Sequence, residues 1–359
     1  MMHNNLTPVC SFLSCNSGLD WYIPKNIRCK SMLVWYNCLL SMAVLKYFVF
    51  CVFLFITISS AYFIYLLCPT SISSEQIRFV VPLEAKQEEV ISQLQSQNFI
   101  RSPKLFTLTA GILRFPGTIE PGAYLLSRRM TTLGIADTLV NHPYQKWIVL
   151  VPGLRKEQVA EKFAKKFEWK ESKVKEFLDN AREGYMFPDT YLINVDYAGI
   201  EVAQKLMSNF NEKFDAKIQQ DLLSRDVRND TAIKIASLIE RESGGDSDRA
   251  LIAGIIWNRL SKEMRLEIDA TVQYALGTSF DWWPIVQGMK MKQVESPYNT
   301  YLYKGLPPAP ICNPSLASIK AVVYPEDTDY LYYLHDRSRQ IHPANTYKEH
   351  LENIEKYLR

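Results

Sequence analysis

A single carboxylate continues the apolar face of a helix predicted in the second half of the chain. Residues 230–245 predict a short helix, because Asp230 can cap its first turn and Gly244-Gly245 can end it. The apolar residues of one face follow at helical spacing: Ala232, Ile235 and Ile239. The next position on that face is Glu242, while Glu240 lies roughly 200° around the helix and is expected to be more exposed to solvent.

The predicted position of Glu242 favours a carboxyl group that stays protonated near neutral pH. Partial burial disfavours the charged form, and the last helical turn presents the negative end of the helix dipole. Both effects raise the pKa, and a protonated carboxyl group is the acid that cleavage of a glycosidic bond requires. The alternative is a structural Glu that pairs with Arg241, Arg249 or another cation, because ion pairs also shift carboxyl pKa values.

Five further motifs accompany this helix along the chain. They are 184–191 (GYMFPDTY), 257–260 (WNRL), 264–274 (MRLEIDATVQY), 296–301 (SPYNTY) and 305–314 (GLPPAPICNP). In this order and spacing they resemble the YceG-like family, over roughly residues 184–335 and more weakly from about residue 77. The chain has Glu240-Arg241-Glu242-Ser243 where the family often has Glu-Lys-Glu-Thr. It also has Asp269-Ala270-Thr271 in place of Asp-Pro-Thr, a change that concerns the shape of that loop.

The resemblance implies a membrane-anchored endolytic murein transglycosylase whose catalytic Glu falls on Glu242. Such enzymes cut the β-1,4 bond between N-acetylmuramic acid and N-acetylglucosamine in peptidoglycan, which limits the length of nascent strands. One Glu protonates the leaving oxygen and then deprotonates the muramyl C6 hydroxyl, which closes on C1 to give a 1,6-anhydro end. That chemistry needs one acid/base carboxylate, whereas ordinary glycosidases use two. Ser243 makes the pair similar to the Glu-Ser pair of other lytic transglycosylases.

Two other functions stay open at the level of the sequence. A hydrolytic muramidase would need a second carboxylate, for which Asp269 and Asp189 are the candidates. Each is favoured to fix a loop through backbone hydrogen bonds, because Asp commonly does this in turns. The other alternative is a non-catalytic scaffold that binds the cell wall, and the intact Glu242 argues against it.

Residues suited to sugar contact surround the predicted acid in the sequence motifs. Tyr rings can stack on pyranose faces, and amide and hydroxyl groups can bond to N-acetyl and hydroxyl groups. The predicted substrate-binding residues are Ser243, Asp269, Gln273, Tyr298, Asn299, Thr300, Tyr301 and Asn313. The alternative for 298–301 is a rigid loop after Pro297 with buried tyrosines. For Asn313 the alternative is a turn-capping role, which is slightly favoured.

An uncharged apolar run precedes all of these motifs. Residues 47–67 contain no charge, Pro or Gly and are long enough to span a bilayer as a helix. The flanking basic residues lie on its N-terminal side: Lys25, Arg28, Lys30 and Lys46. Because 68–76 carry none, the positive-inside rule places the N-terminus in the cytoplasm and the bulk of the chain outside the cell inner (cytoplasmic) membrane. A cleaved signal peptide is less favoured, since no Ala-x-Ala site follows the run.

The chain is predicted to be an α+β protein in four parts. They are a cytoplasmic tail (1–46), a single transmembrane helix (47–68), a small LysM-like α+β subdomain (69–152) and a mixed α+β, YceG-like catalytic domain (153–359). A start at Met42 would give a short leader directly before the span, and this start is about as favoured as Met1.

The exported part begins with the element order β-α-α-β-α-β, between Ile77 and Val151. Further elements are predicted as helices over 153–178, 202–223, 247–262 and 347–358, with a short strand at 331–334. The first group resembles the LysM-like subdomain that precedes the catalytic part in the family. A sugar-binding module and a spacer are about equally favoured for it.

Composition and cysteine placement exclude several other classes of function. The net charge of +3 gives no nucleic-acid footprint. Cys312 is the only Cys between 69 and 359, so this part cannot form an internal disulfide. No metal or cofactor is expected, because no Zn-type Cys pair occurs and the three C-terminal His residues lack metal-like spacing. The expected partners are peptidoglycan glycan strands and the membrane, with the synthases known as penicillin-binding proteins as a further candidate.

Overall fold

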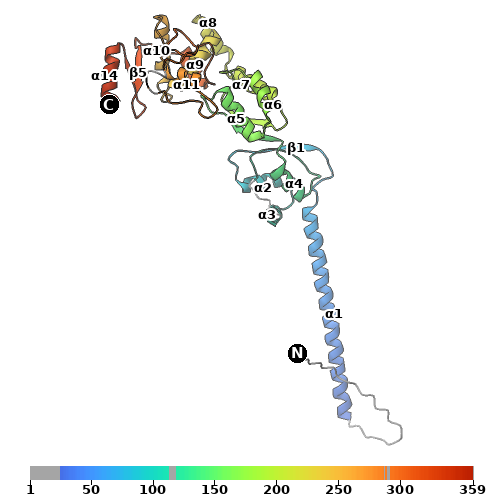
Figure 1. Cartoon of the computed structure of the whole chain (residues 1–359). Helices are drawn as coiled ribbons and strands as arrows, with labels where there is room; N and C mark the ends of the chain where they lie inside the picture. Colours follow the sequence, from blue (N-terminus) through green and yellow to red (C-terminus); the bar gives the residue numbers. More distant parts are fainter. Residues whose placement is uncertain (1–24, 113–118, 287, 289–291, 359) are drawn as a thin grey trace, which may run out of the picture. The chain divides into compact units, whose positions relative to one another are not determined.

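The computed structural model of the chain describes residues 25–112, 119–286, 288 and 292–358 (Figure 1). It divides into two compact units, Met1–Cys68 and Pro69–Arg359. The described part of the first unit is one long helix, α1 (Lys25–Leu67). The predicted span 47–68 is therefore helical except for its last residue, Cys68, and the helix begins further upstream than the sequence indicated. Residues 1–24 of the predicted tail lie outside the described residues.

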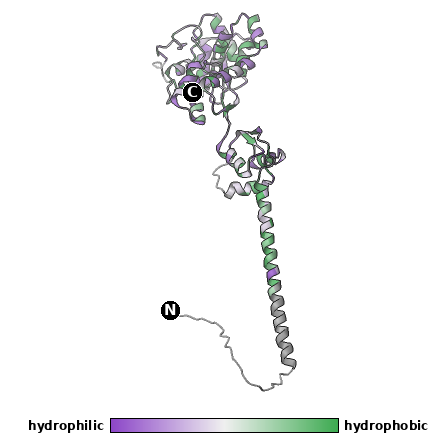
Figure 2. Ribbon diagram, turned by 90° about the vertical axis from the view of Figure 1, so that its right-hand side faces the viewer, coloured by the Kyte–Doolittle hydropathy of each residue, from purple (hydrophilic) through white to green (hydrophobic). Residues whose placement is uncertain are grey.

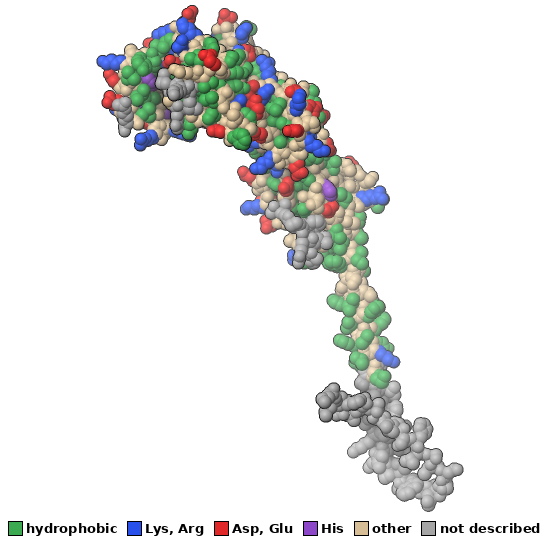
Figure 3. Space-filling model, in the orientation of Figure 1, with side chains coloured by type: hydrophobic (Ala, Val, Ile, Leu, Met, Phe, Trp, Pro, Cys, Tyr) green, Lys and Arg blue, Asp and Glu red, His purple; other side chains and the backbone are tan. Residues whose placement is uncertain are grey.

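The stretch Val44–Leu67 of α1 is long and apolar enough to cross a membrane (Figure 2). All of its side chains from Val44 to Tyr65 are exposed, so the described chain does not cover them. On the face shown in Figure 3, the second unit instead carries interspersed acidic and basic side chains. An apolar helix that is left uncovered in this way fits a membrane anchor.

The second unit contains a four-stranded antiparallel sheet in the order β1-β2-β3-β4. Its strands are β1 (Gln76–Val81), β2 (Gly122–Ser127), β3 (Gln145–Val149) and β4 (Thr190–Asn194). Helices α2 (Gln87–Ser96), α3 (Pro103–Ile112) and α4 (Thr132–Asn141) lie between the first three strands in sequence. The predicted order β-α-α-β-α-β is confirmed over this stretch. The LysM-like assignment and the boundary at 152 stay predictions, and β4 continues the sheet beyond that boundary.

Two of the predicted helices are wrong, because each is divided into two. The segment 153–178 forms α5 (Lys156–Phe167) and α6 (Glu171–Asn180). Glu168 takes a left-handed backbone with φ 55° and ends α5, a stop that charge patterning does not reveal. The segment 202–223 forms α7 (Gly199–Lys213) and α8 (Ala216–Ser224). Asp215 starts α8, since its side chain accepts a hydrogen bond of 2.9 Å from the Ile218 N–H.

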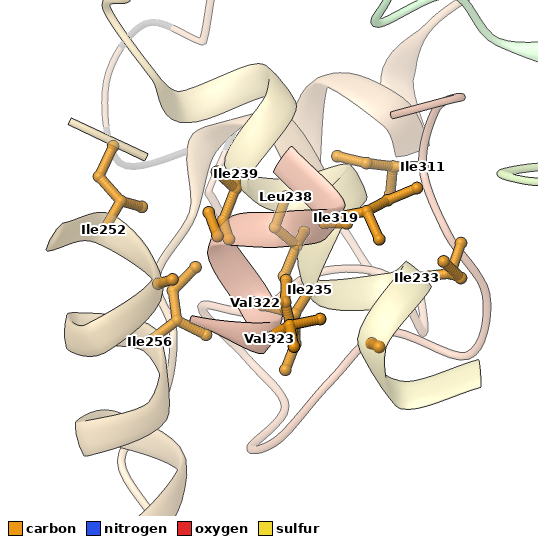
Figure 4. Close-up of a cluster of buried hydrophobic side chains, with 14 of the residues drawn as sticks. Ile233, Ile235, Leu238, Ile239, Ile252, Ile256, Ile311, Ile319, Val322 and Val323 are labelled. Carbon is orange, nitrogen blue, oxygen red and sulfur yellow. The ribbon is translucent and has the colours of Figure 1, made fainter. Parts of the chain in front are cut away.

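The remaining elements form the part of the second unit that contains Glu242. They are α9 (Asn229–Glu242), α10 (Arg249–Ser261), α11 (Asp269–Leu276), α13 (Leu316–Val323), β5 (Tyr332–His335), β6 (Ile341–Ala344) and α14 (Tyr347–Tyr357). Helices α9, α10 and α13 pack against one another around a core that includes Ile235, Ile239 and Val322 (Figure 4). This packing fixes the end of α9, where the predicted acid stands.

The predicted capping role of Asp230 is wrong. The helix begins one residue earlier, at Asn229, and Asp230 lies inside the first turn. Its carboxylate instead forms ion pairs with Lys234 at 2.9 Å and Arg182 at 3.4 Å. An acidic residue in the first turn still interacts favourably with the helix dipole. The N-cap is Arg228, two residues before the predicted cap.

Candidate active site

Glu242 is the last residue of α9, and it lines a cavity of about 310 Å³. Its carboxylate accepts a hydrogen bond of 2.9 Å from the Tyr333 hydroxyl, and the backbone N–H of Ala270 also donates to it. The other lining residues are Arg259, Leu266, Glu267, Asp269, Lys292, Tyr301, Tyr332, Tyr333, Tyr347 and His350. The residue that the helix periodicity singled out therefore lines a cavity, and two hydrogen-bond donors hold its carboxyl group.

The pKa of Glu242 is raised above the usual range of a Glu, chiefly because burial disfavours its charged form. The nearby charge of Asp269 raises the pKa further. Hydrogen bonds from Tyr333 and Ala270 and the electrostatic interaction with His335 lower the pKa of Glu242 in turn. The predicted direction of the shift is confirmed, with burial as its largest cause. The group is half-buried, so it combines partial desolvation with access to the cavity.

Asp269 and Tyr301 lie in the same cavity, where they bond to each other and both contact Lys292. The Tyr301 hydroxyl donates to Asp269 Oδ1 at 2.6 Å, and Lys292 Nζ lies 3.1 Å from the same oxygen. Lys292 Nζ also donates to the Tyr301 hydroxyl at 2.7 Å. The favoured backbone role of Asp269 is therefore wrong, because its carboxylate contacts two side chains of the cavity wall. Burial and the carboxylate raise the pKa of Tyr301, so this phenol stays a donor.

Asn299 is fully buried, and its amide holds the loop that carries Lys292 and Tyr301. Its Nδ2 donates to the carbonyl oxygens of Lys292 and Val294 at 2.9 and 2.8 Å. Its Oδ1 accepts from the backbone N–H of Tyr301 at 3.0 Å. With these bonds made inside the protein, Asn299 does not line the cavity, so it positions the cavity residues in place of the predicted sugar contact.

Thr300 has a comparable role on the other side of this loop. It is buried, and its Oγ1 accepts from the backbone N–H of Ile268 at 2.9 Å. Its hydroxyl also lies 3.0 Å from that of Thr271, a buried residue of α11. The predicted contact of Thr300 with a sugar is not supported, because the hydroxyl ties the loop to the start of α11, directly beside Asp269.

Asn313 connects segments that are distant in sequence. Its Oδ1 accepts from the Met186 N–H at 2.9 Å, and its Nδ2 donates to the Leu154 carbonyl at 2.9 Å. The side chain is buried away from the cavity of Glu242, so its role is structural. Its bonds join distant segments, however, whereas capping of its own turn was the favoured expectation. It lies within 3.3 Å of Glu183, whose pKa burial raises to about 8.

Ser243, Gln273 and Tyr298 are not among the residues that line the cavity. Ser243 is the C-terminal cap of α9, and its N–H bonds to the Ile239 carbonyl at 2.9 Å. The Tyr298 ring packs against Tyr274 with centroids 4.6 Å apart. Of the nine predicted site residues, the structure thus brings Glu242, Asp269 and Tyr301 together.

Asp189, the other candidate for a second carboxylate, lines a different cavity. Its Oδ1 accepts from the Thr190 N–H at 2.8 Å, and its Oδ2 accepts from Asn209 Nδ2 at 3.0 Å. The predicted backbone role is confirmed. Another cavity, of about 550 Å³, lies beside Trp257, and Glu242 does not line it either.

Glu240 was expected to be solvated, and this expectation is wrong. Its side chain is only 7% exposed. Its Oε2 accepts from the N–H and hydroxyl of Ser315, at 2.8 and 2.6 Å, and from the Ser318 hydroxyl at 2.7 Å. Arg249 lies 3.7 Å from its other oxygen. The carboxylate therefore joins α9 to the first turn of α13, a helix that the periodicity of α9 alone cannot reveal.

Replacing Glu240 with Gln should lower the stability of the fold. The amide cannot accept three hydrogen bonds as well as a carboxylate does, and hydrogen bonds to charged groups contribute about 1.5–3 kcal/mol. We expect a lower thermal midpoint for the full chain in detergent. Glu352→Gln is the matched control, since Glu352 is 65% exposed in α14. Equal midpoints for the two variants would contradict a stabilising role for Glu240.

Comparison with known proteins decides the family. The sequence pattern of the YceG-like family matches residues 79–356. The chain belongs to the YceG-like family. It is 29% identical over 316 residues to a Bacillus subtilis protein named endolytic murein transglycosylase, an alignment that covers 80% of this chain and 86% of the relative.

Other relatives of this YceG-like protein match it over different lengths. A Streptococcus pneumoniae protein, also named endolytic murein transglycosylase, is 28% identical over 178 residues, which cover 49% of this chain and 32% of the relative. The crystal structure of a putative yceG-like protein from Listeria monocytogenes superimposes with a TM-score of 0.55 and 26% identity. That match covers 78% of this chain and 99% of the Listeria chain.

Strand β5 of the YceG-like protein contributes two residues near Glu242 that the sequence reasoning missed. Tyr333 and His335 are two positions apart, so they share one face of the strand. His335 Nε2 lies 2.7 Å from Asp248 Oδ2, and this oxygen also accepts the Gly244 N–H at 2.7 Å. Strand β5 thereby bonds to Glu242 through Tyr333, and through His335 and Asp248 it connects to the turn that follows α9. The alternation of side chains along a short strand was the available signal for this shared face. The sequence did not reveal that the strand lies beside the end of α9.

Proposed function

We propose that this chain is a membrane-anchored endolytic lytic transglycosylase. It cleaves the MurNAc-β-1,4-GlcNAc bond of peptidoglycan glycan strands, leaves 1,6-anhydro-MurNAc ends and limits the length of nascent strands. The observation that carries the proposal is Glu242, a carboxyl group of raised pKa in a cavity, within hydrogen-bond reach of Tyr333. The names of the Bacillus and Streptococcus relatives support the substrate class.

Glu242 is the acid and the base of the proposed reaction. Its proton passes to the glycosidic oxygen as the bond between that oxygen and C1 of the muramyl residue breaks. The resulting carboxylate takes the proton of the muramyl C6 hydroxyl, and the C6 oxygen bonds to C1. The donors Tyr333 and Ala270 stabilise the carboxylate between these two steps. Glu242 thus regains a proton by the end of the reaction, and no water is consumed.

The second candidate function is a hydrolytic muramidase, and the position of Asp269 favours it. Asp269 lines the cavity with Glu242, and its charge contributes to the raised pKa of Glu242. Against a role as base, the Asp269 carboxylate is engaged by Tyr301 and Lys292. We therefore assign Asp269 to the positioning of Tyr301 and keep the transglycosylase as the main proposal.

Digestion in ¹⁸O-labelled water tests the reaction type. The muramyl C6 hydroxyl is tethered close to C1, so its attack has an intramolecular advantage over attack by water. We expect mass spectrometry to detect anhydro-muramyl ends without label, on internal fragments of several disaccharides. Labelled reducing ends, heavier than anhydro ends by one water, would overturn the proposal in favour of the muramidase.

We further propose that α1 anchors the chain in the cytoplasmic membrane, with its N-terminus in the cytoplasm. Lys46 directly precedes the uncharged run 47–67, and residues 68–76 carry no Lys or Arg, as the positive-inside rule requires for this orientation. Protease added outside spheroplasts should therefore degrade a tag at the C-terminus and spare one at the N-terminus. A protected C-terminal tag would reverse the orientation. Peptidoglycan synthases of the penicillin-binding class are the proposed protein partners on the outer side.

A further inference from the structure

The cavity at Glu242 is small for a polymeric substrate. Its volume of about 310 Å³ lies at the lower end of ligand sites, which range over roughly 300–1,000 Å³. A glycan strand therefore continues beyond the cavity on either side of the bond that is cut. Surfaces that adjoin the cavity are the places where the neighbouring sugars can bind.

Three rings from β5 and α14 form one wall of this cavity, and we call them the aromatic shelf: Tyr332, Tyr347 and His350. The centroids of Tyr332 and His350 are 5.5 Å apart with the ring planes at 25°, and those of Tyr332 and Tyr347 are 5.9 Å apart. Tyr347 is 60% exposed, so much of its ring remains available. The shelf thus joins the Glu242 cavity to the protein surface.

Core packing does not explain the aromatic residues of α14. The helix has no buried residue, although it lies beside β5 (Figure 1). It is nevertheless held at both ends. Thr346 caps its first turn by accepting the Glu349 N–H at 3.2 Å, and Tyr357 near its end stacks on His342 with centroids 3.5 Å apart. A ring on a fixed helix loses little conformational freedom when it binds a ligand.

The charges around the shelf suit an uncharged ligand with hydroxyl groups. Burial and the neighbouring Arg259 lower the pKa of His350, so its ring is neutral near pH 7. The guanidinium of Arg259 lies 4.9 Å from the Tyr332 ring, and Glu267 lies 3.5 Å from Arg259. Polar groups thus stand beside apolar ring faces, a combination that fits a pyranose, which has apolar C–H faces and a polar rim.

We propose that the aromatic shelf is a saccharide-binding subsite, which binds a sugar of the glycan strand next to the sugars at Glu242. The inference rests on the proposed function and adds the residues that select longer strands. Occupancy of the shelf then gives binding energy that short fragments cannot use, so the enzyme prefers internal bonds of long strands.

The test compares Tyr347→Ala with the wild-type full chain in detergent, on long uncrosslinked glycan strands and on the shortest strand that the wild type cuts. One aromatic contact contributes about 0.5–1.5 kcal/mol, so KM for long strands should rise about 2- to 10-fold with kcat unchanged. KM for the shortest strand should not change. Tyr347→Phe keeps the ring and should restore the wild-type KM.

Leu351→Ala is the matched control, because Leu351 is an exposed apolar residue of α14 that does not line the cavity. An unchanged KM of Tyr347→Ala on long strands, with normal wild-type cleavage, would overturn the shelf while leaving the proposed function intact. An equal rise for Leu351→Ala would also overturn it. A wild-type chain that cuts no glycan contradicts the proposed function itself. In that case the affinity of Glu242→Gln for long strands is compared with that of the double variant Glu242→Gln/Tyr347→Ala. Weaker binding by the double variant supports the shelf, and equal binding overturns it.

Discussion

Replacing Glu242 with Gln should reduce the turnover of peptidoglycan by at least about 10²-fold, the usual scale for the loss of a general acid. The amide keeps the size of the side chain and can still accept a hydrogen bond from Tyr333, but it carries no proton that it can transfer. The rate at which anhydro-muramyl ends form on fragments of glycan strands measures the loss. The fold should persist, because the substitution removes a carboxyl group whose burial is unfavourable to its charged form.

Glu240→Gln is the informative comparison for this result. Glu240 lies in the same helix but faces Ser315 and Ser318, so its substitution should lower stability and leave the turnover of the folded protein largely unchanged. Glu242→Gln should show the opposite pattern. Full activity of Glu242→Gln, or equal losses of turnover per folded molecule in the two variants, would mean that Glu242 is not the acid.

Replacing Tyr333 with Phe should have the second largest effect. The phenol donates to the Glu242 carboxylate, and hydrogen bonds to charged groups contribute about 1.5–3 kcal/mol, so kcat should fall about 10- to 100-fold. A donor favours the charged form, so its removal raises the pKa of Glu242 further. The reaction needs the protonated acid, and the decline of activity on the alkaline side should therefore move to higher pH.

The pH profile separates this role from a purely structural one. A loss of packing alone would lower activity at every pH without moving the alkaline limb. Tyr330→Phe is the control, since Tyr330 lies in the same segment but does not line the cavity. An alkaline limb that stays in place in Tyr333→Phe would show that Tyr333 does not tune the acid.

The sequence was most informative where a pattern within one element was sufficient. The spacing of Ile235 and Ile239 led to Glu242, because a helix face is defined by its own periodicity. The same reasoning failed for Glu240, since its partners stand on α13, more than 70 residues later. Likewise, the left-handed Glu168 that divides α5 from α6 has no signal in charge or hydropathy.

The polar motif at 298–301 shows why residue types alone do not define a binding site. By residue type alone, Asn, Thr and Tyr are equally suited to contact a sugar. In the fold, Asn299 and Thr300 turn inward to hold backbone groups, and Tyr301 alone of the three reaches the cavity. Which side chains face inward depends on the loop path between Lys292 and Tyr301, and that path is fixed by tertiary packing.

The bond between Tyr333 and Glu242 also orders events during synthesis. The two residues are 91 positions apart, so at about 5–20 residues per second the ribosome adds Tyr333 about 5–20 s after Glu242. When α9 has left the ribosome, the β5–β6 hairpin, whose Tyr333 bonds to Glu242, has not yet been made. The carboxyl group of Glu242 therefore gains its phenol donor only after β5 has been made and has paired with β6.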